Sequence, residues 1–328
     1  MNMEEIVALS VKHNVSDLHL CSDSPPRWRR TGRLEPAPFP SPDLGALLKA
    51  WLNDEQQGIW WANGQVDFAA TVAGGQRLRG SAFKQMRGVS VTLRLLPRTC
   101  PRLASLGAPR VIPELLTNAS GLILVTGATG SGKSTTLAAM VDFLNHHTDG
   151  HILTLEDPVE FIYQSARCLI QQREIGQHSP SFADALRSAL RQDPDVILLG
   201  ELRDSETIRL ALTAAETGHL VLATLHAPDA PQAVERIIDA FPAAQQAQVR
   251  AQTALSLAGV CAMRLVPQRA GGRCLATEML VATPAVRSAI RESRTAQLKT
   301  ILQTSRRDGM YTMEQSLLKL VEQKRIAP

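Results

Sequence analysis

The stretch LILVTGATGSGKSTTLAAMVDFL, residues 122–144, limits what this chain can fold into more than any other feature. It contains a complete G-x-x-x-x-G-K-S pattern, formed by Gly127, Gly132, Lys133 and Ser134. A hydrophobic run precedes the pattern and a segment of helical composition follows it, which is the setting in which such a turn binds phosphate. The alternative is a Gly/Ser-rich turn that contains a lysine by chance, but such a turn would not need a strand before it and a helix after it. We therefore predict a phosphate-binding loop.

The residues of the predicted loop have separate tasks at a bound triphosphate. Glycines let backbone N–H groups converge on phosphate oxygens, and the N-terminus of the following helix adds positive partial charge. We expect Lys133 to reach the β- and γ-phosphates and Ser134 to ligate Mg²⁺. The predicted nucleotide-binding residues of the loop are Gly127, Ala128, Thr129, Gly130, Ser131, Gly132, Lys133, Ser134 and Thr135.

The identity of the nucleotide follows partly by exclusion. A GTPase normally carries an N-K-x-D segment that reads the base, and none occurs in this chain. The acceptor site of a small-molecule kinase has no recognisable sequence pattern, so that class stays open. We expect ATP with Mg²⁺.

The spacing of apolar runs favours an α/β fold. A chain of 328 residues is longer than the usual single domain, so two domains are expected. Strand-like runs alternate with helical stretches at residues 122–126, 152–155, 195–199 and 220–224. This alternation is typical of a parallel sheet flanked by helices.

The residues before the loop indicate a smaller α+β domain. Helical patterns cover residues 3–13 and 43–57, and strand patterns cover residues 16–20, 66–72, 77–85 and 89–96. The segment PRTCPRLASLGAP, rich in proline and small residues, makes the best domain boundary. We expect an N-terminal domain at residues 1–97, a linker at 98–110, a nucleotide-binding core at 111–270 and a helical C-terminal region at 271–328.

Composition argues against several kinds of partner. The net charge of +4 comes from 35 basic and 31 acidic residues, which is too balanced to imply nucleic-acid binding. The cysteines Cys21, Cys100, Cys168, Cys261 and Cys274 form no C-x-x-C pair, so we expect reduced thiols and no zinc. No segment approaches the ~18 apolar residues that span a bilayer. We expect a cytoplasmic protein that binds no nucleic acid and does not insert directly into a membrane.

A second apolar run, in DPDVILLGELRD at residues 193–204, ends at Gly200 and Glu201. In enzymes with a phosphate loop, the strand next to the loop delivers a carboxylate to the water shell of Mg²⁺. We expect Glu201 to occupy that position. The alternative is a surface glutamate at the end of a strand, because the usual aspartate at the end of the apolar run is missing.

Three carboxylates follow a third apolar run in ILTLEDPVEF, residues 152–161: Glu156, Asp157 and Glu160. They should lie at the carboxyl edge of the same sheet, where ligands of such folds bind. Mg²⁺ would offset their repulsion, and one of them would orient the attacking water or accept its proton. We expect Glu156 at the metal, Asp157 at the nucleotide and Glu160 turned back toward the site. Turn formation and helix capping are the alternative for Glu156 and Asp157.

An ordered set of segments carries a longer resemblance. They are GATGSGKSTTLAAM, LTLEDPVEF, QREIG, SFADALRSALRQDPDVILLGELRDSETIRLALTAAETGHLVLATLHAPDA and RIIDAFP. Together they resemble the secretion ATPase superfamily of type II secretion and type IV pili. Within it the chain is most similar to the PilT family of pilus-retraction ATPases, from SDLHL to GMYTMEQSL.

The resemblance implies a fold and a mechanical function. It implies a RecA-like core, an N-terminal PAS-like domain and a ring of six subunits with nucleotide between domains. Glu160 would be the catalytic glutamate that activates water, and Glu201 the second acid on the Mg²⁺ side. The implied motor couples ATP hydrolysis to domain motion. It acts on an inner-membrane platform protein, at the cytoplasmic face of that membrane, and disassembles type IV pilus-like fibres.

The resemblance also assigns residues whose local pattern says little. His219 and His226, in GHLVLATLH, match a histidine box that senses or lines the nucleotide site. Without the family, a histidine beside a buried strand is more often a hydrogen-bonding residue. Arg79 and Arg94 match arginines that reach the phosphates from the N-terminal domain, and Arg87 is a third possibility. Such groups neutralise γ-phosphate charge, whereas surface exposure is the ordinary explanation for an arginine on a strand.

Two departures from the superfamily pattern keep other functions open. Extension and type II secretion ATPases carry a four-cysteine zinc insert, but only Cys261 and Cys274 lie in that region, which favours the retraction branch. The PilT segment AIRNLIRE appears as AVRSAIRE at residues 285–292, with smaller side chains that weaken a packing surface. A secretion or conjugation ATPase that drives export, and a nucleotide-binding module with little turnover, therefore stay as alternatives.

Overall fold

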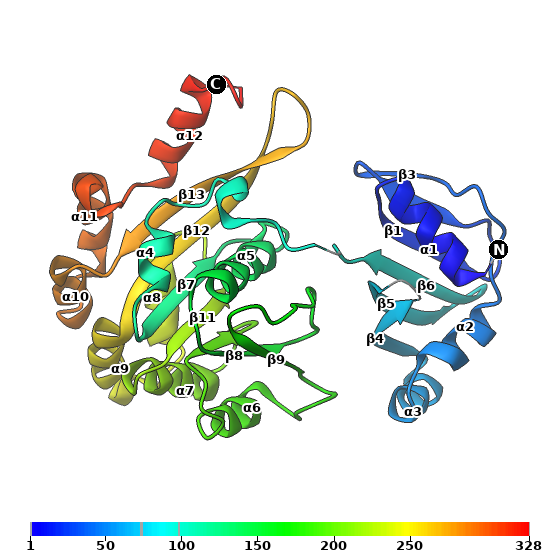
Figure 1. Ribbon diagram of the computed structural model, residues 1–328, viewed down its shortest axis with the longest axis horizontal. Helices are drawn as coiled ribbons and strands as arrows, with labels where there is room; N and C mark the ends of the chain where they lie inside the picture. The colour runs from blue at the N-terminus through cyan, green and yellow to red at the C-terminus, as the bar shows by residue number, and fades with distance from the viewer. Residues whose placement is uncertain (1, 73–74, 98, 328) are drawn as a thin grey trace. The chain divides into compact units, whose positions relative to one another are not determined.

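The computed structural model describes residues 2–72, 75–97 and 99–327. The chain divides into two compact units, Met1–Thr99 and Cys100–Pro328 (Figure 1). The division falls inside the predicted linker, whose residue Arg98 lies outside the described residues. Residues 271–328, expected as a separate helical region, belong to the second unit.

The first unit is built on an antiparallel sheet with the strand order β3-β2-β1-β6-β5-β4. Its elements are α1 (Met3–Lys12), β1 (Val15–Cys21), β2 (Arg27–Arg30), β3 (Arg33–Pro36), α2 (Leu44–Trp51), α3 (Asp54–Asn63), β4 (Gln65–Val72), β5 (Gln76–Gln85) and β6 (Gly88–Leu95). One core cluster joins Leu18 and Leu20 of β1 to Leu48 of α2 and Trp60 of α3. The predicted small α+β domain is therefore confirmed.

The helix predicted over residues 43–57 is two helices, α2 and α3. Asn53 breaks it, because its side chain accepts a hydrogen bond from the Gln56 N–H at 2.8 Å. The Gln56 side chain in turn accepts from the Asn53 N–H at 3.1 Å. This reciprocal capping box starts a new helix at Asp54.

The second unit contains a mixed sheet with the strand order β13-β12-β7-β11-β10-β8-β9. Its strands are β7 (Gly121–Thr126), β8 (His151–Glu156), β9 (Leu169–Glu174), β10 (Val196–Leu199), β11 (Leu220–Leu225), β12 (Leu257–Pro267) and β13 (Arg273–Val281). All neighbouring pairs are parallel except β12 with β13. The α/β fold and the predicted strands β7, β8, β10 and β11 are confirmed.

Helices lie on both faces of this sheet (Figure 1). They are α4 (Ile112–Leu116), α5 (Lys133–His147), α6 (Phe182–Ala189), α7 (Ser205–Glu216), α8 (Ala230–Asp239), α9 (Ala243–Ser256), α10 (Pro284–Arg291), α11 (Leu298–Thr304) and α12 (Met313–Glu322), with 3₁₀ turns η1 (Leu103–Leu106), η2 (Thr295–Gln297) and η3 (Arg306–Asp308). Among the helices that the structure describes, none has both the length and the apolar character needed to cross a membrane.

Three strands of the second unit were not expected, for identifiable reasons. β9 is a partly exposed edge strand of mixed polarity, so its sequence has no apolar run. β12 begins at Leu257, directly after α9 ends at Ser256, so no turn residue separates the two elements. β13 falls where helix was predicted, and its antiparallel pairing with β12 makes the sheet mixed.

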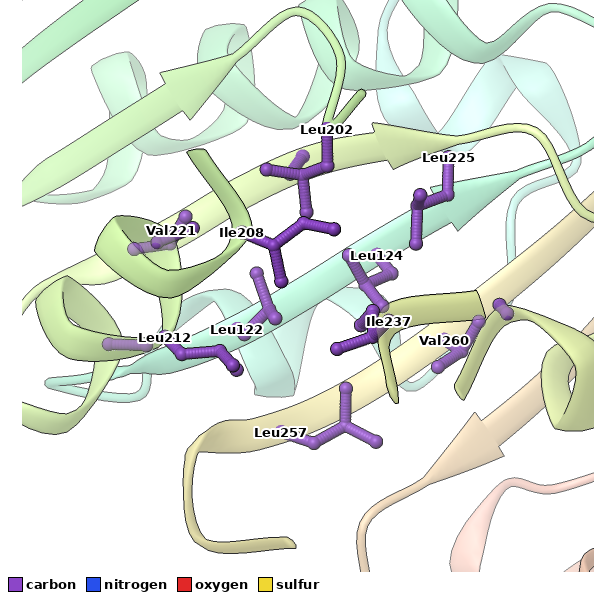
Figure 2. Packing of buried hydrophobic residues seen from close by; sticks show 14 of the residues in the cluster. Leu122, Leu124, Leu202, Ile208, Leu212, Val221, Leu225, Ile237, Leu257 and Val260 are labelled. Atoms are coloured by element: carbon purple, nitrogen blue, oxygen red, sulfur yellow. The ribbon is translucent and has the colours of Figure 1, made fainter. Parts of the chain in front are cut away.

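Successive residues of β7 pack on opposite faces of the sheet. Leu122 and Leu124 belong to the buried cluster that contains Ile208 of α7 (Figure 2). Ile123 and Val125 belong to a second buried cluster, which includes residues of α5. Burial on both faces explains the continuous apolar run before the loop. Because β7, β8, β10 and β11 are parallel, their carboxyl ends meet at one edge of the sheet.

Candidate nucleotide-binding site

The predicted phosphate loop lies between the end of β7 and the start of α5. Gly127, Gly130 and Gly132 have φ angles of +144°, +77° and +97°, values that favour glycine. Gly132 is the residue before α5, and within the described chain no side chain caps the helix there. The first backbone N–H groups of α5 are thus available to an anion.

Gly127→Ala is expected to destabilise the second unit by roughly 2–4 kcal/mol. A Cβ atom at this position would lie 2.5 Å from the carbonyl oxygen of Met263 and 2.7 Å from the hydroxyl of Ser131. Chemical denaturation monitored by circular dichroism measures the loss. Gly130→Ala is the matched control, because its Cβ would meet nothing within 4 Å and only the strain of its φ angle remains, about 1 kcal/mol. Equal losses in the two variants would contradict the steric argument.

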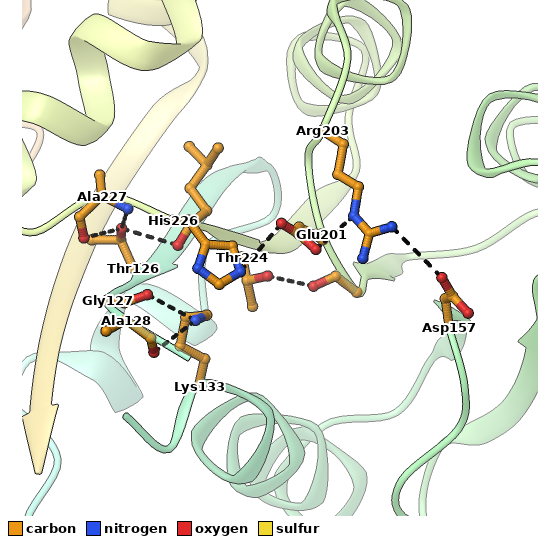
Figure 3. Close-up of polar contacts among 12 residues, drawn as sticks. Thr126, Gly127, Ala128, Lys133, Asp157, Glu201, Arg203, Thr224, His226 and Ala227 are labelled. Atoms are coloured by element: carbon orange, nitrogen blue, oxygen red, sulfur yellow. Dashed lines mark hydrogen bonds and ion pairs between the residues drawn. The ribbon is translucent and has the colours of Figure 1, made fainter. Parts of the chain in front are cut away.

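Lys133 is held against the loop by two backbone carbonyls. Its Nζ donates to the Gly127 oxygen at 2.8 Å and to the Ala128 oxygen at 3.1 Å (Figure 3). Burial lowers the pKa of Lys133, and the negative charge of Glu201 partly offsets this. The ammonium group therefore lies inside the glycine turn and within the field of an acid from another strand.

The remaining loop residues differ in burial. Ala128, Thr129, Gly130 and Ser134 are exposed, and Thr135 is half-buried. Ser131 is buried, and its hydroxyl has no hydrogen-bond partner among the described residues. A buried hydroxyl of this kind is a group that a bound oxygen atom would satisfy.

Glu201 follows β10 and lies beside two basic side chains. The Arg203 Nε is 2.7 Å from its Oε2, and the His226 Nε2 is 3.3 Å from its Oε1 (Figure 3). The prediction that the strand of Glu201 is next to the strand of the loop is wrong, because β11 lies between β7 and β10. His226 directly follows β11, the strand between β7 and β10, and its side chain contacts Glu201.

Arg203 is a site residue that the sequence reasoning missed. Besides Glu201 it approaches Asp157, with 3.8 Å between its Nη1 and the Asp157 Oδ2 (Figure 3). Its guanidinium thus connects the carboxyl ends of β10 and β8. Its position in the sequence could have indicated this role. Arg203 lies two residues after Glu201 in GELRD, where its positive charge could offset the charges of the predicted cluster of carboxylates.

Two threonine hydroxyls join the carboxyl ends of three neighbouring strands. The Thr126 hydroxyl accepts from the Ala227 N–H at 2.8 Å and lies 3.1 Å from the Leu225 oxygen. The Thr224 hydroxyl donates to the Gly200 oxygen. Both threonines are buried. The segments after β7, β11 and β10 are therefore tied to one another by direct hydrogen bonds (Figure 3).

Glu156 and Glu160 lie close together at the end of β8. The Glu156 carboxylate accepts hydrogen bonds from the Thr154 hydroxyl at 2.7 Å and from Gln172 of β9 at 3.3 Å. Burial raises the pKa of Glu156 to about 7, against the opposing effect of these hydrogen bonds and of the Glu160 backbone N–H. The charge of Glu160 raises it slightly further. A carboxyl group with a pKa near neutrality suits proton transfer.

Glu156→Gln is expected to stabilise the second unit above neutral pH and to make its stability less dependent on pH. The wild-type carboxyl changes from a pKa of 4.5 when unfolded to about 7 when folded, so the folded state binds more protons between these values. Wild-type stability therefore falls as pH rises from 4.5 to about 7, by on the order of 1–3 kcal/mol. Thermal unfolding at about pH 5 and about pH 8 measures the effect. A difference in Tm between variant and wild type that does not grow with pH would contradict it; the exposed Glu322→Gln is the control.

The two predicted histidines lie at opposite ends of β11. His219 precedes the strand and His226 follows it, a separation of roughly 20 Å at ~3.3 Å per residue. The His219 Nδ1 is 3.0 Å from the Ala214 oxygen, and its own carbonyl accepts from the Gly121 N–H at 3.1 Å. His219 therefore lies away from the phosphate loop of its own chain, contrary to expectation.

The arginines expected at the phosphates lie in the first unit. Arg79 of β5 and Arg94 of β6 are cross-strand partners, and the Arg94 Nε lies 2.8 Å from the Asp17 Oδ1. Arg87, at the turn between these strands, lies 3.7 Å from the Asp23 Oδ2. Their reach to a nucleotide stays a prediction.

Several known proteins are similar to this chain in sequence and in fold. Residues 63–326 match the family described as type II/IV secretion system protein. The uncharacterized protein YggR of Escherichia coli (strain K12) is 65% identical, over 96% of this chain and 97% of its own length. The type IV pilus retraction ATPase PilT of Pseudomonas aeruginosa is 44% identical, over 98% of this chain and 94% of its own length. A crystal structure of the pilus retraction motor PilT with bound ADP has a TM-score of 0.93 at 42% identity, covering 100% of this chain and 95% of that chain.

Proposed function

Because the chain belongs to the type II/IV secretion system protein family, we propose that it is an ATP-hydrolysing motor of the PilT type. The observation that carries the proposal is the position of Lys133. Its ammonium group lies inside a glycine turn between strand and helix, close enough to Glu201 for that charge to affect its pKa. A cation and an acid at the carboxyl edge of a parallel sheet suit the binding of a magnesium triphosphate.

The loop residues are suited to hold the triphosphate. Backbone N–H groups of the loop and of the first turn of α5 would donate to phosphate oxygens. Ser131 has a buried hydroxyl without a hydrogen-bond partner among the described residues, and Gly127 packs too closely against Met263 and Ser131 to carry a side chain. Lys133 would exchange its two carbonyl partners for phosphate oxygens. These features fit a nucleotide phosphate group.

The carboxylates would bind the metal ion and activate the attacking water. Ser134 at the first turn of α5 and Glu201 would hold Mg²⁺, with Glu156 contributing through water, and bound Mg²⁺ supplies charge neutralisation at the phosphates. Glu160 would orient the attacking water and accept its proton. Glu156, which lies beside Glu160 and has a pKa of about 7, would then take the proton from Glu160.

The mechanical part of the proposal follows the named relatives. One solved relative is the pilus retraction motor PilT with bound ADP. We extend to this chain a ring of six subunits in which Arg79, Arg94 and Arg87 reach the nucleotide, so that hydrolysis moves one domain against the other. The ring would work in the cytoplasm, peripherally at the inner membrane, on a platform protein, and would drive retraction of type IV pilus-like fibres.

Assembly and turnover test the enzymatic part. We expect the full chain to form a hexamer in light scattering with ATP and Mg²⁺, and to release phosphate in a reaction that chelation of Mg²⁺ stops. Tight ATP binding without measurable phosphate release would instead support a nucleotide-binding module with little turnover. A monomer that neither assembles nor binds ATP would refute both.

The direction of work needs a cellular test. Deletion of the gene from its own host is expected to leave surface fibres that no longer retract, and complementation with the wild type but not with Lys133→Ala should restore retraction. Loss of fibres or of a secreted product on deletion would support the secretion or conjugation ATPase instead.

A further inference from the structure

A cavity of about 690 Å³ opens in the second unit, away from the phosphate loop. Its walls come from residues 103–113, from β13, and from residues 306–325 at the C-terminal end. Pockets of roughly 300–1,000 Å³ are the usual size for organic ligands. Phe143, the part of α5 that reaches the cavity, lies ten residues after Lys133, which is about 15 Å along the helix. The cavity is therefore separate from the phosphate site.

The charge of the lining is one-sided. Four cationic side chains, Arg110, Arg306, Lys319 and Arg325, line the cavity, and no acidic residue does so among the described residues. None of the four takes part in an ion pair within the part of the chain that the structure describes. The described lining of the cavity therefore carries a net positive charge that no neighbouring carboxylate of the lining neutralises.

The wall between these cations is apolar, with a few hydroxyl groups. Val111, Phe143 and Leu275 supply apolar surface. The Tyr311 and Thr277 hydroxyls lie 2.7 Å apart and can share a further hydrogen bond with an occupant. Cations at the rim and an apolar wall together suit a ligand that has an anionic group on an apolar body.

We propose that this cavity binds a small organic anion, in which one or more phosphate, sulfonate or carboxylate groups are attached to an aromatic or aliphatic body. The anionic groups meet Arg306, Arg325 and Lys319, since guanidinium groups form paired hydrogen bonds with such oxygens. The apolar body lies on Phe143 and Leu275. The site is distinct in position and in residues from the phosphate loop.

Two elements connect the cavity to the phosphate loop. Phe143 belongs to α5, which begins at Lys133. Thr277 of β13 is the cross-strand partner of Met263, whose carbonyl oxygen lies 2.5 Å from where a Cβ of Gly127 would be. An occupant would therefore contact α5 and β13, the two elements that lie against the loop.

The test uses 8-anilinonaphthalene-1-sulfonate, a fluorescent probe with an aromatic body and one sulfonate, titrated into the full chain. The double variant Arg306→Glu/Arg325→Glu is expected to bind it roughly tenfold more weakly or worse than the wild type. The matched control is Arg307→Glu/Lys324→Glu, which makes the same charge change at neighbouring exposed residues that do not line the cavity. Control affinity should stay within about twofold of the wild type.

Two further experiments distinguish probe binding in the cavity from probe binding at the phosphate loop. Pyrophosphate should displace the probe from the wild type more effectively than sodium chloride of the same ionic strength. Lys133→Ala should bind the probe like the wild type even if it releases no phosphate, which separates this proposal from the proposed function. The proposal would be overturned if the two double variants bound the probe equally well. It would also be overturned if pyrophosphate did not displace the probe, or if Lys133→Ala lost probe binding.

Discussion

Lys133→Ala is expected to lower steady-state phosphate release by on the order of 10²–10³-fold. The side chain supplies the one cation that the described loop holds within hydrogen-bond distance of its own carbonyls, at 2.8 and 3.1 Å. Burial lowers the pKa of Lys133, and the negative charge of Glu201 opposes that shift. Alanine removes that charge from the position where negative charge increases during phosphoryl transfer.

The measurement is a continuous phosphate-release assay with saturating ATP and Mg²⁺, together with circular dichroism to verify folding. Lys299→Ala, at an exposed position of α11, is the matched control and should keep wild-type turnover. Turnover of Lys133→Ala within about threefold of wild type would show that the reaction does not depend on the phosphate loop as proposed.

Glu160→Gln is expected to reduce turnover roughly 10²–10⁴-fold while leaving ATP binding close to that of the wild type. Glutamine keeps the shape of the side chain but cannot accept the proton of the attacking water. The Glu160 backbone N–H that hydrogen-bonds to Glu156 is unchanged, so the end of β8 should keep its structure. The loss should therefore appear in kcat, with little change in KM.

The comparison variant is Glu156→Gln, which tests the neighbouring carboxyl group. If Glu160 is the base, removing Glu156 should cost less turnover and should flatten the pH profile of kcat near pH 7, where Glu156 titrates. A large loss in Glu156→Gln combined with near-normal turnover in Glu160→Gln would transfer the role of base to Glu156.

The glycine turn between β7 and α5 was predictable because its determinants in the sequence are local. Strand, glycine turn and helix follow one another within the stretch before and after Gly127, so a short segment of sequence displays all three. The positions of Glu156 and Glu201 at one sheet edge were also predictable, because apolar runs that alternate with helices specify a parallel sheet and hence common carboxyl ends.

Other features depend on contacts that the sequence does not display. Strand order is decided by packing across the whole sheet, so the place of β11 between β7 and β10 was missed. The expectation for His219 came from the family resemblance, whereas its position before β11 puts it at the amino end of that strand. Arg203 gains its partner Asp157 from a segment more than forty residues away. The cavity combines residues 103–113 with residues 306–325, and no local pattern connects segments so distant.

The threonine hydrogen bonds at the carboxyl edge have a mechanical consequence. Since Thr126 holds the segment after β11 and Thr224 holds the segment after β10, a movement of the glycine turn would act on the segments that carry His226 and Glu201. We therefore expect the segments after β7, β11 and β10 to move together and not as three independent loops.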